Sequence, residues 1–198
     1  MIGVLCPSSF EYKALDLARL KKAGASAELS GMGKLRSLLG ALRLYEKHPD
    51  LRGILLVGFA GGLTPDLSVG DVVEPHVFIE QDYCAEPFEK FPNRIELRGR
   101  RKLVSSSVKA VMLTQDRFLT ENPYKGKALH GARTLACDME SYAVAKFCLE
   151  KKIRFAAVKL VSDVADENAS HDFLAACRRL APKLNRTVLA AVKSFQKK

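Results

Sequence analysis

The sequence predicts an α/β fold built around a largely parallel sheet with helices on both of its faces. Strand-like and helix-like segments alternate from the first residue, and the strand-like segments, such as ILLVGFA, are continuous apolar runs. Such runs are typical of strands buried on both faces, and the amphipathic segments between them indicate crossover helices. The 198 residues are enough for a substantial core, and we expect one domain over residues 1–198.

The first half of the chain is expected to alternate between strands and helices. Strands are expected at residues 2–6, 26–30, 52–60 and 70–80. Helices are expected at residues 10–24, where Gly24 is a stop signal, and at residues 34–48, just before Pro49.

The second half begins with an irregular region, because Pro87, Pro92 and Gly99 interrupt residues 81–109. Beyond it we expect strands at residues 108–114, 132–139 and 154–163, and a helix at residues 139–152. A helical region is expected from residue 170 to residue 195, with Pro182 in the first turn of a second segment.

Composition argues against a nucleic-acid-binding or membrane-spanning protein. The net charge is +10, and the densest basic segment is RIELRGRRK at residues 94–102. No aromatic residues interleave with these charges to stack on bases, so we interpret the segment as a solvated basic face. The apolar run at residues 54–60 is too short to span a bilayer, and the N-terminus lacks the basic region of a signal peptide. We therefore expect a cytoplasmic protein.

Cysteine and histidine spacing indicates neither a disulfide framework nor a metal site. The five cysteines include no CxxC pair, and the four histidines show no metal-ligand spacing. Because a metal site normally needs three or four clustered ligands, we expect no metal.

Small and acidic residues gather where the expected strands end. Open α/β sheets bind ligands at the carboxyl ends of their strands, so these positions are candidates for a site. They are Glu11, Gly61, Gly62, Asp138, Glu140, Ser162 and Asp163. Each has a simpler explanation by itself, because Glu11 and Glu140 suit a first helical turn and Ser162 or Asp163 suits an N-cap. Together they indicate a ligand site at one edge of the sheet.

Three segments carry a family resemblance: GFAGGL with the following VGDVV, then CDMESYAVAKFC, then VKLVSDVADENASHDF. In this order they resemble the nucleoside phosphorylase and nucleosidase superfamily, and most closely the methylthioadenosine/S-adenosylhomocysteine nucleosidases. SGMGK at residues 30–34 fits the same pattern, so the resemblance extends from Glu11 to Phe173. It implies a three-layer α-β-α sandwich around a mixed, largely parallel sheet, a purine nucleoside as substrate, no cofactor and a homodimer.

The resemblance also implies roles for three catalytic carboxyl groups. Asp163 matches the acid that protonates or hydrogen-bonds N7 of the leaving purine, and Ser162 would orient it. Such general acid catalysis is typically worth about 10²- to 10⁴-fold, and it needs a carboxyl group whose pKa is raised by burial. Glu140 matches the carboxylate that binds the ribose hydroxyls near the developing positive charge. Glu11 matches the carboxylate that orients the attacking water.

The remaining matched residues would bind the nucleoside. Ala60 and Gly61 would let the ribose approach the backbone, and Met139 would pack against it. Phe118 would stack on adenine, although a core aromatic residue is the alternative for this position. The other expected contacts are the Leu119 backbone to the base edge and Phe173 as a cover, and Asp138 and Lys159 are also expected to bind the substrate.

Three departures from the family pattern leave alternatives open. Phe59 stands where a Ser or Thr is usual, Lys159 replaces an Arg, and Asp138 replaces a Glu. A nucleoside-binding protein that has lost turnover is therefore one alternative. A phosphorylase of the hopanoid-associated type is another, with a cation from Lys34, Arg36 or Lys159, and futalosine hydrolases are a third relative. We favour hydrolysis, because the loop CPSSFE lacks the arginine that phosphorylases usually carry there.

Overall fold

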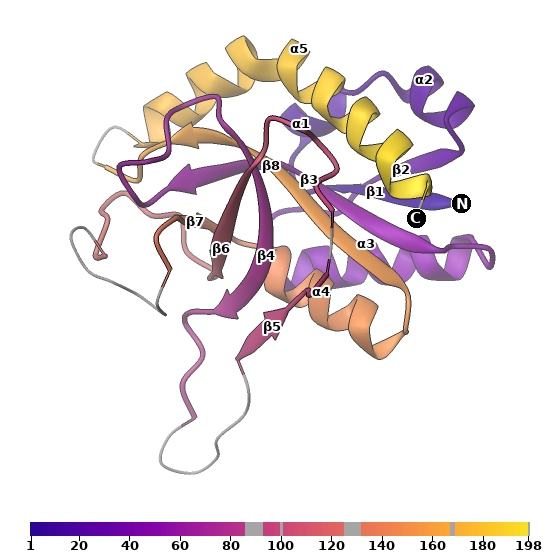
Figure 1. Ribbon diagram of the computed structural model, residues 1–198, viewed down its shortest axis with the longest axis horizontal. Helices are drawn as coiled ribbons and strands as arrows, with labels where there is room; N and C mark the ends of the chain where they lie inside the picture. The colour runs from indigo at the N-terminus through magenta and orange to yellow at the C-terminus, as the bar shows by residue number, and fades with distance from the viewer. Residues whose placement is uncertain (86–92, 100, 125–131, 167–168, 198) are drawn as a thin grey trace.

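A computed structural model describes residues 1–85, 93–99, 101–124, 132–166 and 169–197 (Figure 1). Its strands are β1 (Ile2–Cys6), β2 (Ala25–Leu29), β3 (Gly53–Gly62), β4 (Val72–Glu80), β5 (Arg94–Glu96), β6 (Val108–Thr114), β7 (Leu135–Asp138) and β8 (Arg154–Asp163). Its helices are α1 (Ser9–Lys13), α2 (Leu17–Lys22), α3 (Lys34–Lys47), α4 (Ser141–Glu150) and α5 (Ala169–Gln196).

The strands form one mixed sheet, as the sequence predicted. Parallel pairs join β1 to β2, β1 to β3, β3 to β8, β4 to β6 and β6 to β7. The antiparallel pairs are β3 with β7, β4 with β5 and β4 with β8. These pairings close a ring through β3, β8, β4, β6 and β7. Closure brings the ends of β3, β7 and β8 together, since Gly61 pairs with both Cys137 and Asp163.

Both faces of the central strand β3 are buried, which explains its continuous apolar run. Ile54 and Leu56 pack in a cluster that includes residues of α3 and α4, whereas Leu55 and Val57 pack in a cluster with the apolar side of α5. This alternation follows from the two-residue period of a strand. Figure 1 shows α3 and α4 on one side of the sheet and α5 on the other. The predicted α/β fold with helices on both faces is therefore confirmed.

The expected helix at residues 10–24 is two helices, α1 and α2, so the prediction of one helix was wrong. Ser8 and Glu11 form a capping box at the start of α1. The Asp16 side chain then accepts a hydrogen bond from the Arg19 N–H at 3.0 Å and starts α2. A second N-cap inside an apolar pattern ends one helix and begins another.

Two further differences concern the second half of the chain. Within the region expected to be irregular, β5 pairs antiparallel with β4. Helix α5 runs through Pro182 without a break, so the expected second segment does not exist. Buried residues lie on both sides of the exposed Pro182, including Cys177 and Leu184, and this packing holds the helix together across the proline. None of the helices in the described ranges is long and apolar enough to cross a membrane.

Candidate active site

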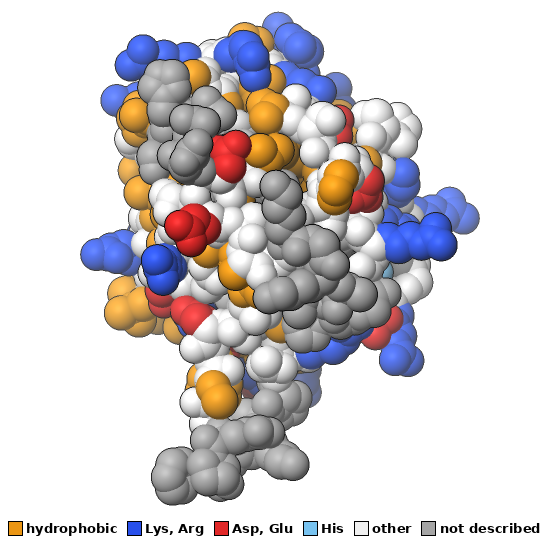
Figure 2. All heavy atoms as spheres, turned by 90° about the vertical axis from the view of Figure 1, so that its left-hand side faces the viewer, with side chains coloured by type: hydrophobic (Ala, Val, Ile, Leu, Met, Phe, Trp, Pro, Cys, Tyr) orange, Lys and Arg blue, Asp and Glu red, His pale blue; other side chains and the backbone are white. Residues whose placement is uncertain are grey.

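A pocket of about 390 Å³ lies where β3, β7 and β8 end. Its volume is in the range of small-molecule sites. In Figure 1, β3 and β8 run side by side toward the left of the view. Figure 2 views the molecule from that side and shows Asp and Glu side chains within the face and Lys and Arg mostly around its edge. Every predicted site residue except Gly62 and Lys159 lines the pocket: Glu11, Ala60, Gly61, Phe118, Leu119, Asp138, Met139, Glu140, Ser162, Asp163 and Phe173.

Glu11 is held against β3 by backbone hydrogen bonds. Its carboxylate accepts the N–H of Ser8 at 2.6 Å and the N–H of Phe59 at 2.8 Å. Gly58 has a φ of 144°, and a Cβ atom there would lie 2.2 Å from Oε1 of Glu11. Burial raises the pKa of Glu11, and Lys159 and these hydrogen bonds oppose the rise. Only a glycine at position 58 lets this carboxylate lie so close to the strand.

Lys159 is fully buried between two of the predicted carboxylates. Its Nζ atom lies 3.2 Å from Oδ2 of Asp138 and 3.3 Å from Oε2 of Glu140. Burial acts to lower the pKa of Lys159, but Asp138, Glu140 and Glu11 outweigh it and raise this pKa above its ordinary value. Lys159 does not line the pocket, so its contacts are with the carboxylates that do.

Burial raises the pKa of Glu140 from 4.5 to about 7, with Lys159 lowering it and Asp138 raising it. The other oxygen of Glu140, Oε1, accepts the N–H of Gly33 at 3.2 Å. Gly33 has a φ of 98° and precedes α3, so the SGMGK turn supplies one hydrogen bond to this carboxylate. The turn could be predicted from the sequence, but its hydrogen bond to Glu140 could not, because the two residues are far apart in the chain.

The turn before α3 is itself anchored by three acids. Nζ of Lys34 donates to Glu80 at 2.8 Å and to Asp82 at 2.7 Å. The backbone N–H of Lys34 donates to Oδ1 of Asp116 at 2.7 Å. These contacts tie the residue that follows Gly33 to the ends of β4 and β6, and so fix the N–H that reaches Glu140.

Asp138 is positioned by the strand beside it and by the first turn of α4. Oδ1 of Asp138 accepts the hydroxyl of Thr114 at 2.9 Å, and Oδ2 accepts the hydroxyl of Ser141. The Ser141 N–H also lies 3.2 Å from both carboxylate oxygens. With these donors and Lys159 around it, Asp138 anchors Lys159 beneath the pocket.

Asp163 lies at the end of β8 with both oxygens hydrogen-bonded. Oδ2 accepts the hydroxyl of Ser162 at 2.7 Å, and Oδ1 accepts the N–H of Ala165 at 3.0 Å. A Cβ atom at Gly61 would lie 2.9 Å from Sγ of Cys137 and 3.2 Å from Oδ1 of Asp163. The glycine at the end of β3 therefore makes room for its two neighbouring strands, beside the pocket that it lines.

Three aromatic rings form one wall of the pocket. Phe173 meets Phe59 edge to face at 6.1 Å between centroids, and Phe118 at 5.8 Å. Phe118 is 39% exposed, so it is not the core aromatic residue that its place after a strand allowed. Phe59 is buried, and its ring belongs to this wall in place of the hydroxyl group expected from the family pattern.

Four more lining residues were not predicted: Pro7, Met32, Arg117 and Cys137. Arg117 directly precedes Phe118, and Met32 belongs to SGMGK. Their position next to these predicted features was the only sign in the sequence that they would line the pocket. Burial raises the pKa of the Cys137 thiol well above its usual range, which makes it a weak nucleophile. Among the residues that the structure describes, no group of three or more His, Cys, Asp or Glu side chains is arranged to hold a metal ion.

Fold and pocket together define an α/β protein with a set of buried carboxyl groups at the carboxyl ends of its strands. The family model described as "Phosphorylase superfamily" matches residues 16–193, and the chain belongs to this superfamily. Over 189 residues it is 25% identical to the 5′-methylthioadenosine/S-adenosylhomocysteine nucleosidase of Shewanella sediminis (strain HAW-EB3), covering 84% of this chain and 81% of the relative.

Two solved structures from Helicobacter pylori share the fold. The 5′-methylthioadenosine/S-adenosylhomocysteine nucleosidase has a TM-score of 0.82 and 19% identity, covering 96% of this chain and 97% of its own. The futalosine hydrolase of strain 26695 has a TM-score of 0.81 and 20% identity, covering 96% of both chains. The predicted superfamily is thereby confirmed, and these named relatives are nucleosidases, the enzyme class that the motifs predicted.

Proposed function

We propose that this protein is a nucleosidase that hydrolyses the N-ribosyl bond of an adenine nucleoside, such as methylthioadenosine or S-adenosylhomocysteine, and releases adenine. One observation carries the proposal. Glu11, Glu140 and Asp163, which lie at or beyond the ends of three different strands, meet in one pocket beside a wall of aromatic rings. Breaking this bond puts positive charge on the sugar and negative charge on the base, and a pocket with several separate carboxyl groups can serve both.

The base belongs at the aromatic side of the pocket. Phe118 and Phe173 present rings on which a purine can stack. Asp163 would donate a proton or hydrogen bond to N7 of the base, with the hydroxyl of Ser162 fixing its orientation. A general acid in this position typically accelerates the reaction by about 10²- to 10⁴-fold.

The sugar belongs beside Glu140, with Met139 against it. Lys159 and the Gly33 N–H hold the Glu140 carboxylate in place, so its ionised form is ready to stabilise the developing oxocarbenium charge. Glu11 would bind the attacking water. Its oxygens accept the backbone N–H groups of Ser8 and Phe59 and keep lone pairs for a water hydrogen.

Hydrolysis suits the site better than phosphorolysis because two of the candidate cations are already paired and the third lies outside the pocket. Lys34 is bound by Glu80 and Asp82, and Lys159 is bound by Asp138 and Glu140. Arg36 lines a neighbouring hollow with Phe10 and Met32, and it does not line the active pocket. A phosphate in the pocket would meet Arg117 as a lining cation, but it would also face the carboxyl groups of Glu11, Asp138, Glu140 and Asp163.

Adenine release measures the proposed reaction directly. Purified protein is incubated with methylthioadenosine, S-adenosylhomocysteine, adenosine or futalosine, each with and without phosphate. We expect adenine from the first two without phosphate, and an Asp163→Asn variant should lose at least about 100-fold in rate. A base released only from futalosine would contradict the proposed substrate, and release only with phosphate would contradict hydrolysis.

We also propose that the protein is a homodimer. Leu35 and Leu39 are 67% and 45% exposed on α3, directly after the SGMGK turn. Phe10, Leu29 and Met32 are also exposed, around the hollow next to the pocket. Several exposed apolar side chains on and near one helix favour a protein interface, and Met32 would carry the contact to the pocket itself.

A further inference from the structure

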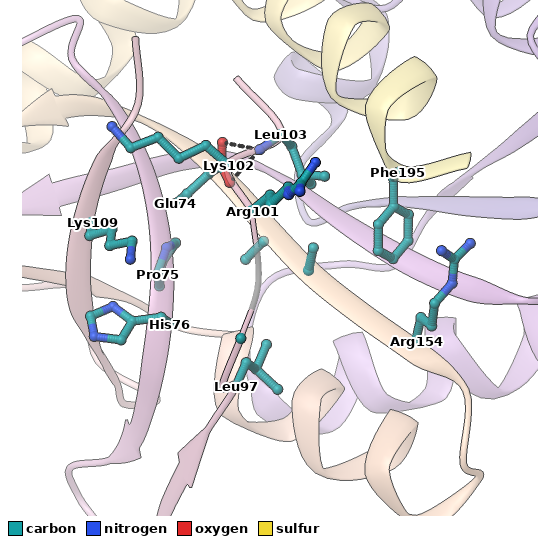
Figure 3. Close-up of a pocket in the computed structure, with 13 residues that line it drawn as sticks. Glu74, Pro75, His76, Leu97, Arg101, Lys102, Leu103, Lys109, Arg154 and Phe195 are labelled. Carbon is teal, nitrogen blue, oxygen red and sulfur yellow. Dashed lines mark hydrogen bonds between the residues drawn. The ribbon is translucent and has the colours of Figure 1, made fainter. Parts of the chain in front are cut away.

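A second pocket of about 410 Å³ lies apart from the candidate active site, and the two share no lining residue. Its walls come from β4, β6 and β8, from the segment between β5 and β6, and from the end of α5 (Figure 3). Arg101 and Lys102 belong to the basic segment at residues 94–102. That segment, interpreted above as a solvated face, therefore lines a cavity.

The second pocket is strongly cationic. Four basic side chains line it: Arg101, Lys102, Lys109 and Arg154. Glu74 is the only carboxylate among the described lining residues, and its oxygens accept the backbone N–H groups of Leu103 and Val104 at 2.7 to 3.0 Å. Glu74 thus holds the segment in place, and the four cations outnumber it.

Two lining residues have buried nitrogen atoms without a hydrogen-bond partner in the described chain. These atoms are Nη1 of Arg154 and Nδ1 of His76. The guanidinium of Arg154 lies 4.7 Å from the centre of the Phe195 ring, which fixes its plane. Figure 3 shows Arg154 and Phe195 together at one side of the pocket and His76 and Lys109 at the other. Buried polar atoms normally have a hydrogen-bond partner. Each side of this pocket therefore has a buried nitrogen atom that a bound ligand could contact.

The geometry points to a binding site for a small organic anion. A phosphate or carboxylate group would pair with Arg154, since a guanidinium binds such groups with parallel hydrogen bonds. The apolar body of the ligand would lie on Ala156, Ala157 and Leu97, toward His76 and Lys109 at the far side. This proposal does not depend on the reaction at the active site.

Fluorescence titration with 1-anilinonaphthalene-8-sulfonate, an aromatic anion, tests the site on the full chain. We expect saturable binding that weakens about tenfold in Arg154→Met and in the double variant Arg101→Gln/Lys109→Gln, because bonds to charged groups are strong. The double variant changes only exposed side chains, so it keeps the test valid if Arg154→Met does not fold. 1-Naphthyl phosphate and 1-naphthoate, which differ only in the anionic group, then compete and show which group is preferred.

Two controls separate the second pocket from other sites. Arg186→Gln removes an exposed charge from α5 outside both pockets, and Phe118→Ala alters the active pocket. Neither should change the affinity for the probe. If Arg186→Gln weakened the binding of the probe equally, the binding would be nonspecific charge attraction. If Phe118→Ala weakened it while Arg154→Met and the double variant did not, the probe would be in the active pocket. Either result, or displacement by neither naphthyl compound, would overturn the proposal.

Discussion

At the scale of single residues, the most consequential side chain is the buried Lys159. It faces Asp138 and Glu140 at 3.2 and 3.3 Å in a region without solvent. Lys159→Met would leave two buried carboxylates without their cation, and we expect a loss of about 3–5 kcal/mol in the free energy of unfolding. Urea denaturation measures it. Lys146→Met, which breaks the exposed pair with Glu150, should leave the free energy of unfolding nearly unchanged, and similar losses in both variants would contradict this view.

The pKa of Glu140 predicts a pH dependence. This pKa is raised from 4.5 to about 7, so the protonated form stabilises the fold below about pH 4.5, and that contribution is lost as the pH rises through about 7. Catalysis needs the ionised form, so kcat/KM should fall as the pH drops below about 7. Lys159 lowers this pKa, and Lys159→Met should therefore move the acidic limb to higher pH. A profile unchanged in Lys159→Met would refute the assignment.

Gly58 is a residue whose importance appears only in the folded chain. A Cβ atom there would lie 2.2 Å from Glu11, so we expect Gly58→Ala to displace that carboxylate, lower activity and cost more than about 2 kcal/mol in stability. Gly99→Ala is the matched control, because Gly99 also has a positive φ and nothing lies within 4 Å of its Cβ position. It should cost about 1 kcal/mol from backbone strain alone. Thermal denaturation and adenine release compare the two.

At the scale of elements, α5 carries a proline that its packing overrides. Removing Pro182 restores a helical hydrogen bond and relieves a steric clash, and together these are worth roughly 3 kcal/mol. The greater freedom of the unfolded chain without the proline offsets up to about 1 kcal/mol of this gain. Pro182→Ala should therefore raise the free energy of unfolding by about 2–3 kcal/mol. Lys183→Ala, an exposed change at the next position, should have little effect. No gain in urea denaturation would mean that α5 is already relaxed around the proline.

Hydrophobic period and strand length predicted most elements, because both act locally. They located the buried strands β3 and β8 and the helices α3 and α4 within a few residues. They failed where side-chain capping or pairing decides the outcome. Asp16 divides a continuous apolar pattern into α1 and α2, and β5 exists because β4 offers it an edge. Neither cause has a signal in the spacing of apolar residues.

At the scale of the whole molecule, the ring of strands explains how much of the site the sequence could predict. Residues at strand ends could be chosen in advance, because parallel strands put their carboxyl ends at one edge. The hydrogen bond from Gly33 to Glu140 and the contact of Gly58 with Glu11 join distant segments that only ring closure brings together. Lys159 was expected among the substrate-binding residues, but the pairing of β8 with β3 and β4 encloses it, and it does not line the pocket.

The largest scale is assembly, and the exposed leucines on α3 lead to a prediction about the oligomeric state. A face with Leu35 and Leu39 exposed is costly in water, and a second copy would cover it together with Met32 at the pocket. Leu35→Glu/Leu39→Glu should therefore give a monomer in light scattering. Adenine release should also fall, because the second copy no longer lies beside the pocket. Leu149→Glu places the same charge at an exposed leucine on α4 and should leave the dimer intact. A wild-type protein that is monomeric at micromolar concentration would refute the dimer, and the site would then have to bind its nucleoside within one chain.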